Sequence, residues 1–303
     1  MPQRTTVTVD GHDIEISKLD KELYPHDGIT KGDVVDYFQA VAEAMLTHIA
    51  DRPLTMVRFP DGIDAEGFFQ KEASEHFPDW VRTVDVPVRG GGKPVRQVVC
   101  NDAATLVYLA NQACLEFHVG LAKVDDLEHP DRFVVDVDPP ADVELSDLRN
   151  AVRRVKDAFE EVGLTPFVQL TGGRGFHVVA ALDGSASFDD VLPFARTFAS
   201  HIAEQDPDHL TVEQRKEKRG DRIFLDVNRN AYGQTAIAPY SLRAREGASV
   251  ATPIEWKELG RVEPGCFHVD SVRRRLSQKQ DPWSGLGRQA ASLRDVARRL
   301  TSS

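Results

Sequence analysis

Cysteine is scarce in this sequence: Cys100, Cys114 and Cys266 are odd in number and widely spaced. Such a set forms neither a disulfide framework nor a CxxC zinc site, so we expect reduced, partly buried thiols. Long hydrophobic runs are also missing, because no apolar stretch is long enough to span a membrane and the N-terminus has no apolar signal core. These absences predict a soluble, cytoplasmic protein with no membrane association.

Positive charge is in deficit, with 37 Lys and Arg against 48 Asp and Glu and a net charge of −11. Neutralising nucleic-acid phosphates needs Lys and Arg, so this balance argues against a general nucleic-acid-binding protein. Net charge does not locate charge, however. Basic residues cluster at 82–96, 215–222, 243–245 and 273–275, which leaves room for a local basic groove on an acidic body.

The chain of 303 residues is long enough for one large or two moderate domains. Its patterns predict a hairpin around Asp10-Gly11, a helix capped by Thr30 and another capped by Ser146. Strands are expected at 54–59, 115–119, 132–138, 167–170, 176–181 and 222–226, and helices at 31–50, 102–112, 145–162 and 188–204. This order predicts an α/β or α+β body in two contiguous lobes, followed by a basic, helical tail from Asp270.

Two aspartates end an apolar stretch that stops at Pro139 and Pro140. Asp136 and Asp138 are spaced i, i+2, so on a strand they would point to the same face. Neighbouring carboxylates repel each other, and hard oxygen ligands on a rigid strand suit Mg²⁺ or Mn²⁺. The stretch therefore predicts a divalent-metal site. Taken alone, it also fits a strand end with two solvated aspartates.

A glycine-rich turn at 171–175 joins two apolar strands ahead of His177. Its glycines permit positive φ and close backbone approach, and exposed N–H groups in such a turn favour an anion. Arg174 and His177 add the charge and directional donors that a triphosphate needs. The turn is not a P-loop, because the GK[ST] ending is missing. The alternative is a hairpin with His177 hydrogen-bonded in the core.

Further polar residues follow in the same half of the chain. Ile223 to Leu225 lead into Asp226, a third strand-borne carboxylate that would complete a two-metal site. Arg243 follows a segment that is bent by a proline, and Gln234 lies upstream of it. A guanidinium at this position could bind a triphosphate through two parallel hydrogen bonds. A surface salt bridge is the alternative role for Arg243.

Aromatic residues stand out in the first half. Phe68 and Phe69 are adjacent on an expected strand, so one would face the core and the other solvent. An exposed ring beside Arg58 and Lys71 suits stacking on a base or sugar. The alternatives are two buried phenylalanines and, for His118, a histidine satisfied within its strand.

Three motifs follow one another along the chain: a strand that ends in Asp-x-Asp, a turn of small residues that leads to a histidine, and a strand that ends in Asp. In this order, they resemble the motifs of the archaeo-eukaryotic primase superfamily. The chain looks most like the polymerase domain of bacterial ligase D, from Asp20–Pro25 through Ala238–Arg243 to Trp256. The resemblance implies a primase-polymerase core with central mixed or antiparallel sheets flanked by helices. It implies one catalytic domain over 1–303, comprising an N-terminal lobe (1–125), a metal- and nucleotide-binding lobe (126–260) and a helical tail (261–303).

The resemblance also implies residue roles. Catalytic metal ligands would be Asp136, Asp138 and Asp226. The incoming nucleotide would be held by Thr171, Arg174, His177, Gln234, Arg243 and, near its sugar, His118. DNA would be bound by Lys21, Lys31, Arg58, Phe68, Phe69, Lys71, Arg89 and Lys93.

Parts of the DNA-binding set have more specific implied roles. Lys21 and Lys31 match positions that receive the 5′ phosphate of a gap or recessed end. The two phenylalanines would stack at the templating end, and the 87–97 loop matches one that helps to bring two DNA ends together. Arg174 stands where relatives carry Lys, a change that keeps the charge and alters the donor geometry.

The resemblance therefore predicts a template-directed DNA/RNA polymerase that extends a DNA primer in gap filling and end joining. It implies two Mn²⁺ or Mg²⁺ ions as cofactors and nucleoside triphosphates as substrates. The implied partners are gapped or 5′-phosphorylated DNA, Ku and a separate ATP-dependent DNA ligase, and the implied location is the nucleoid. Two alternatives stay open. A metal-dependent nuclease or phosphohydrolase would not need the glycine-rich turn plus Arg243. A non-catalytic DNA-end-binding module would not need three strand-borne aspartates.

Overall fold

The computed structural model describes residues 4–301, which form two compact units. Unit 1 holds the chain up to Gly120, together with Thr235–Thr252 and Phe267–Gln280. Unit 2 holds Leu121–Gln234, Pro253–Cys266 and the chain from Asp281 onward. The two units are thus interleaved in sequence, whereas the predicted lobes were consecutive segments. The grouping of 1–303 into one catalytic domain stays a prediction.

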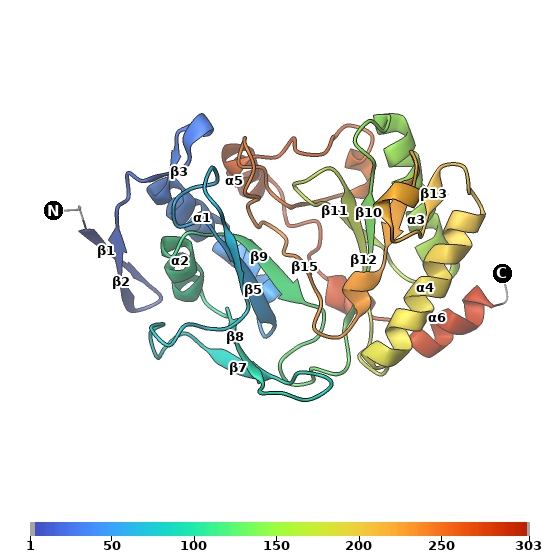
Figure 1. Ribbon diagram of the computed structural model, residues 1–303, viewed down its shortest axis with the longest axis horizontal. Helices are drawn as coiled ribbons and strands as arrows, with labels where there is room; N and C mark the ends of the chain where they lie inside the picture. The colour runs from blue at the N-terminus through green and yellow to red at the C-terminus, as the bar shows by residue number, and fades with distance from the viewer. Residues whose placement is uncertain (1–3, 302–303) are drawn as a thin grey trace. The chain divides into compact units, whose positions relative to one another are not determined.

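Unit 1 is built on a six-stranded sheet with the path β15-β9-β5-β8-β7 (Figure 1). The sixth strand, β6, pairs with β5 off this path. The strands are β5 (Pro53–Arg58), β6 (Phe68–Gln70), β7 (Thr83–Val86), β8 (Val95–Val99), β9 (Cys114–Gly120) and β15 (Thr235–Ile237). Two small hairpins precede them: β1 (Arg4–Val9) with β2 (His12–Ser17), and β3 (Glu22–Tyr24) with β4 (Ile29–Thr30). Its α-helices are α1 (Lys31–Ile49), α2 (Ala103–Asn111) and α5 (Val269–Gln278).

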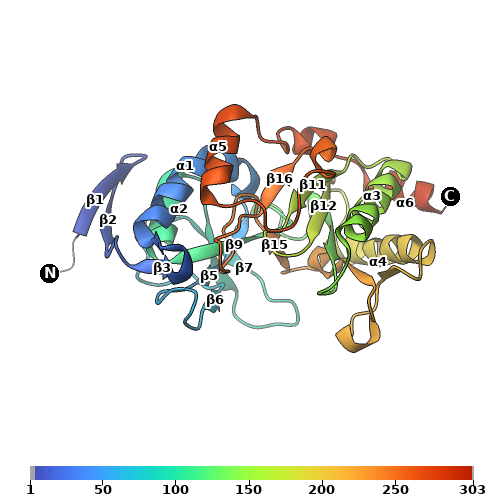
Figure 2. The same cartoon turned by 90° about the horizontal axis from the view of Figure 1, so that it is seen from above.

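Helix α1 begins where the sequence predicts, because Thr30 caps it. The Thr30 hydroxyl accepts a hydrogen bond from the Asp33 N–H at 3.2 Å, and the Asp33 carboxylate accepts one from the Thr30 N–H at 2.8 Å. The helix packs against α2 and buries Phe38 and Met45 in the core of unit 1 (Figures 1 and 2). The capped start fixes the position of Lys31, its first residue.

Unit 2 is built on a second six-stranded sheet, of order β13-β14-β10-β12-β11-β16. Its strands are β10 (Arg132–Asp138), β11 (Phe167–Leu170), β12 (Phe176–Ala181), β13 (Leu210–Thr211), β14 (Ile223–Asp226) and β16 (Thr252–Ile254). Its α-helices are α3 (Leu145–Glu161), α4 (Phe188–Glu204) and α6 (Leu293–Leu300). Phe133 of β10 packs against Phe159 of α3 and Phe198 of α4, which anchors β10.

The predicted fold class, α/β or α+β with sheets flanked by helices, is confirmed. The Ser146 cap is wrong: α3 begins at Leu145 after Glu144, and no side-chain hydrogen bond caps it. The predicted tail forms two helices, α5 in unit 1 and α6 in unit 2. Within residues 4–301 there are also five short 3-10 helices: η1 (Pro25–Asp27), η2 (Lys216–Lys218), η3 (Asn228–Asn230), η4 (Trp256–Glu258) and η5 (Leu286–Gln289).

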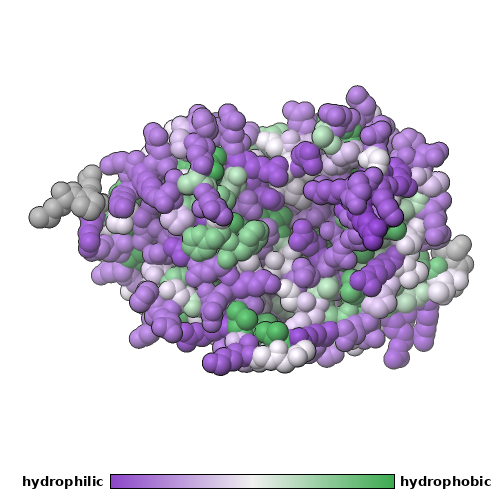
Figure 3. All heavy atoms as spheres, in the orientation of Figure 1, coloured by the Kyte–Doolittle hydropathy of each residue, from purple (hydrophilic) through white to green (hydrophobic). Residues whose placement is uncertain are grey.

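The three cysteines are free thiols, as expected. Between residues 4 and 301, no helix combines the length and the apolar character that crossing a membrane requires. The face of the molecule drawn in Figure 3 is mainly hydrophilic, with hydrophobic atoms in small groups.

Candidate active site

The three predicted metal ligands occupy neighbouring positions on two strands of unit 2. Asp136 and Asp138 are half-buried while Val137 between them is fully buried, so the two carboxylates share a face of β10 as predicted. Asp226 lies directly opposite Asp136 in the antiparallel register of β14 with β10. Directly opposed residues project from the same face. The register therefore adds Asp226 to the same side of the sheet.

The same register extends this set into a polar row across four strands. Gln169 of β11 lies opposite His177 of β12, which lies opposite Asp136, which lies opposite Asp226. His177 and Gln169 are almost fully buried, at 3% and 1% exposure. Buried polar side chains are costly unless they interact with one another. Here the Gln169 amide nitrogen lies 3.3 Å from His177 Nδ1, and His177 Nε2 lies 3.5 Å from an Asp136 oxygen.

Both negatively and positively charged side chains surround the aspartates. Burial raises the pKa of Asp138, the neighbouring Asp136 raises it further, and Arg174 and Arg219 oppose the rise. Arg219 Nη1 lies 3.7 Å from an Asp138 oxygen, and Arg229 Nε lies 3.8 Å from Asp136. The raised pKa means that ionised Asp138 is destabilised where it stands, and a bound cation would relieve that cost.

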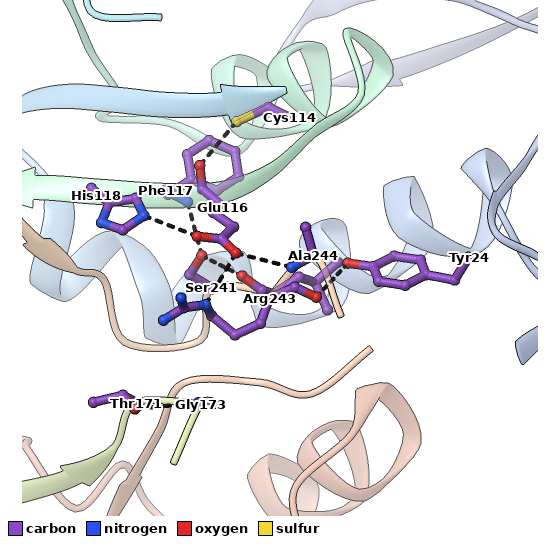
Figure 4. A network of polar contacts seen from close by, with 11 residues as sticks. Tyr24, Cys114, Glu116, Phe117, His118, Thr171, Gly173, Ser241, Arg243 and Ala244 are labelled. Carbon is purple, nitrogen blue, oxygen red and sulfur yellow. Dashed lines mark hydrogen bonds and ion pairs between the residues drawn. The ribbon is translucent and has the colours of Figure 1, made fainter. Parts of the chain in front are cut away.

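The glycine-rich turn packs directly against the aspartate strand. A Cβ on Gly175 would lie 2.3 Å from the Val137 carbonyl oxygen, so only glycine permits this approach. Gly172 adopts a φ of +68°. The Thr171 hydroxyl donates to the Gly175 carbonyl at 3.1 Å. It also accepts from the Gly173 N–H at 3.2 Å, a contact drawn in Figure 4. Thr171 therefore holds the shape of the turn, while Arg174 is exposed at its tip.

In unit 1, His118 and Arg243 are joined by a residue that sequence reasoning missed. Glu116 is 8% exposed on β9, with His118 Nε2 at 3.1 Å from one carboxylate oxygen and Arg243 Nε at 3.1 Å from the other (Figure 4). Burial alone would raise the pKa of Glu116, but hydrogen bonds and charge from His118, Arg243 and the Ala244 N–H lower it to about 2. The carboxylate is thus ionised at any pH at which the protein would work.

Both predicted aromatic residues are exposed, Phe68 to 45% and Phe69 to 73%, so the expectation that one would be buried is wrong. Among the described strands β6 pairs only with β5, and this short strand at the edge of the sheet leaves a large part of both rings exposed. The Arg58 guanidinium lies 5.4 Å from the Phe68 ring centroid, and its Nε donates to the Gln112 carbonyl at 2.8 Å. The Phe69 ring lies 6.2 Å from the His118 ring. Lys71 is exposed beside them.

Lys21 and Lys31 are brought together by the β3–β4 hairpin, since the Lys31 N–H donates to the Lys21 carbonyl at 2.7 Å. Lys31 is 7% exposed, and burial followed by repulsion from Lys18 and Lys21 lowers its pKa from 10.5 to about 8. Lys21 forms an ion pair with Asp61 at 2.6 Å. Lys18, which sequence reasoning missed, completes a cationic cluster of three lysines in unit 1.

The remaining predicted residues lie on exposed segments. Arg89 and Lys93 flank Gly90, Gly91 and Gly92, whose φ values of +91°, +95° and +125° require a glycine run at this turn. Gln234 is exposed at the end of a segment of unit 2, while Arg243 belongs to unit 1. The roles assigned to these side chains stay predictions.

The comparisons with known proteins agree with one another. The model of the LigD primase-polymerase domain matches residues 30–283. The multifunctional non-homologous end joining proteins LigD of Mycobacterium bovis and Mycobacterium tuberculosis are each 34% identical over 296 residues, 95% of this chain. The polymerase domain from Mycobacterium tuberculosis Ligase D in complex with DNA matches with a TM-score of 0.85 and 32% identity, over 92% of this chain and 99% of that one.

The chain therefore belongs to the family of LigD primase-polymerase domains, a family of nucleotidyltransferases. It spans 38% of the length of the two mycobacterial LigD proteins. Nucleotidyl transfer in this family depends on a divalent metal.

The donor set of unit 2 fits such a metal. Three carboxylates on adjacent strand positions are the hard oxygen ligands that Mg²⁺ and Mn²⁺ prefer. Among residues 4–301, however, no three His, Cys, Asp or Glu side chains are arranged as a metal-binding group. Asp136 and Asp138 instead point oxygens toward His177, Arg229 and Arg219. The backbone positions fit a metal site, and the side-chain conformations are those of aspartates that face a histidine and two arginines.

Proposed function

We propose that this chain is a template-directed polymerase that adds nucleotides to the 3′ end of a DNA primer. The observation that carries the proposal is the row Asp226–Asp136–His177, with Asp138 beside it, in a member of the LigD primase-polymerase family. Three carboxylates and a phosphate-binding donor on one sheet face are what nucleotidyl transfer requires.

Asp136, Asp138 and Asp226 would hold two divalent ions, Mg²⁺ or Mn²⁺. When bound, these ions lower the pKa of the primer 3′-OH and neutralise the charge that develops on the triphosphate. The chain's own residues orient the substrate. The Gln169 amide nitrogen lies 3.3 Å from His177 Nδ1, which leaves Nε2 as the ring nitrogen that would contact a phosphate oxygen. Arg174 and the N–H groups of the turn supply further donors for the triphosphate.

We also propose roles for the residues of unit 1. Arg243 would bind the triphosphate and His118 would lie against the nucleotide sugar, with Gln234 of unit 2 as a further nucleotide contact. Phe68 and Phe69 offer exposed rings for base stacking, which contributes about 1–3 kcal/mol per base. Phosphate contacts are assigned to Arg58, Lys71, Arg89 and Lys93.

The names of the relatives indicate the biological setting. LigD of Mycobacterium tuberculosis is a multifunctional non-homologous end joining DNA repair protein, and its polymerase domain has a solved structure in complex with DNA. We infer gap filling at 5′-phosphorylated ends during double-strand break repair for this chain. Ku and a separate ATP-dependent DNA ligase are the partners we propose, at the nucleoid.

Incubation with a primed template, Mn²⁺ and labelled nucleotides separates this function from its two alternatives. A polymerase lengthens the primer, a metal-dependent nuclease or phosphohydrolase shortens it or degrades the nucleotides, and a DNA-end-binding module retains the DNA unchanged. Parallel reactions with ribonucleotides and deoxyribonucleotides measure the sugar preference.

Replacing both lysines of the predicted 5′-phosphate site should remove the preference for phosphorylated gaps. A terminal phosphate carries more charge than an internal one, and each charge-assisted hydrogen bond contributes about 1.5–3 kcal/mol. We therefore expect the Lys21→Ala/Lys31→Ala variant to lose at least about tenfold in the affinity ratio between gaps with and without the phosphate. Fluorescence anisotropy on the two DNAs measures this ratio. Lys257→Ala, at an exposed lysine of unit 2, is the control.

The preference should also depend on pH with a definite sign. Only protonated Lys31 attracts the phosphate, and its pKa in the free protein is lowered to about 8. Above that pH, binding must first take up a proton, so the wild-type preference should be full about one unit below pH 8 and should fall about one unit above it. A preference that stays constant through this range removes Lys31 from the site, and a preference that survives in the double variant removes both lysines.

A further inference from the structure

Glu116 is a buried carboxylate to which no step of the proposed reaction assigns a role. It lies on β9 between Leu115 and Phe117, both fully buried, and is itself 8% exposed. An ionised carboxylate in such a place is costly unless it is paired and hydrogen-bonded. Its presence therefore calls for an explanation from its partners.

The two oxygens of Glu116 have different partners (Figure 4). Oε2 lies 3.1 Å from His118 Nε2. Oε1 accepts hydrogen bonds from Arg243 Nε at 3.1 Å and from the Ala244 N–H at 3.0 Å. One carboxylate thus connects a histidine on its own strand with an arginine 127 residues away in sequence.

The segment that carries Arg243 is held by further hydrogen bonds, at Arg243 itself and at the residues before it. The Tyr24 hydroxyl donates to the Arg243 carbonyl at 3.0 Å, and the Ser241 hydroxyl accepts from the Phe117 N–H at 2.8 Å. Tyr240 adopts a φ of +67° although it is not glycine, and its carbonyl accepts from the buried Tyr37 hydroxyl at 2.8 Å. Strained backbone that is held by its surroundings is typical of functional positions.

We propose that Glu116 is a positioning residue that holds the Arg243 guanidinium and the His118 imidazole in the orientation that binds the incoming nucleotide. The inference rests on the proposed polymerase function. An arginine side chain loses rotational freedom when it binds a ligand, and a fixed anion at Nε removes part of that freedom before the ligand arrives. Orienting two side chains from one carboxylate also couples them.

The test compares Glu116→Gln with wild type in primer extension. Glutamine keeps the volume and one carbonyl oxygen, but it lacks the charge that orients both partners. We expect the KM for the nucleotide to rise at least tenfold, kcat to change less than threefold, and DNA affinity to stay unchanged. The control Glu15→Gln alters an exposed carboxylate of unit 1 that pairs with Arg4, and it should leave the nucleotide KM unchanged.

A purely structural role for Glu116 predicts a different pattern. The melting temperature would fall. The kcat, the nucleotide KM and the DNA affinity would then all worsen to a similar extent, or none of them would change. Coupling gives a further distinction: when Glu116→Gln is combined with Arg243→Ala, the two effects on nucleotide KM should be far from additive. Additive effects contradict positioning.

If Glu116→Gln does not fold, Glu116→Asp keeps the charge but moves it by one methylene, and it should also raise the nucleotide KM selectively. A wild-type KM in the folded variant overturns the inference and leaves the polymerase function standing. Wild-type protein that extends no primer overturns the proposed function, and the inference with it.

Discussion

Asp136→Ala and Asp138→Ala should each reduce primer extension by at least about 10³-fold, which corresponds to roughly 4 kcal/mol of transition-state stabilisation. The reason is their position: the two carboxylates share one face of β10, and Asp226 lies opposite Asp136 on β14. Losing a metal ligand removes charge neutralisation at the reacting groups. Single-turnover extension at low Mn²⁺ measures the effect.

The fold should survive these changes. Burial and Asp136 raise the pKa of Asp138, so its ionised form destabilises the folded state at neutral pH. Asp138→Ala should therefore melt at or above the wild-type temperature. Asp142→Ala alters an exposed aspartate beyond the two prolines and should extend primers normally. Wild-type extension by either site variant would remove that aspartate from the reaction.

The second large effect concerns nucleotide binding. Arg243→Ala and His177→Ala should each weaken nucleotide binding by about 2–5 kcal/mol, because each removes a buried or partly buried charge-assisted donor. DNA affinity, measured by fluorescence anisotropy without nucleotide, should change little. Nucleotide titration of the DNA-bound protein measures the loss.

Two controls support this prediction. His209→Ala alters an exposed histidine that pairs with Asp206, and Arg4→Ala alters an exposed arginine that pairs with Glu15. Both should bind nucleotide normally. Part of the Arg243→Ala effect will come from Glu116, which stays buried with one partner fewer. If DNA affinity falls as much as nucleotide affinity, Arg243 and His177 contact the nucleic acid instead.

The periodicity of β-strands was enough to predict that Asp136 and Asp138 share a face, and the structure confirms it. The pairing of one strand with another could not be predicted in this way, because it depends on which strands the tertiary fold brings together. Nothing local in the sequence places Asp226 opposite Asp136, or β15 beside β9 across more than a hundred residues. The same limitation applies to the interleaving of the compact units, because which segments pack together depends on the tertiary fold.

Burial was the harder property to predict. One of Phe68 and Phe69 was expected to face the core and the other solvent, but β6 is a short edge strand with both rings exposed. The burial of Lys31 had no signal in the sequence, since a lysine at a helix start is normally solvated and this one is 7% exposed. Glu116 carried a local signal, a carboxylate between two apolar strand residues, but its meaning depends on Arg243, which only the tertiary fold brings to it.

Single-nucleotide incorporation on four gapped DNAs that differ only in the templating base tests the central claim most directly. Each reaction would contain Mn²⁺, one labelled nucleotide and a 5′-phosphorylated gap. We predict that each template directs incorporation of its complementary nucleotide, and that Asp136→Ala abolishes all four reactions. Incorporation of the same nucleotide opposite every base, or primer shortening in place of extension, would contradict the assignment of this chain as a template-directed polymerase.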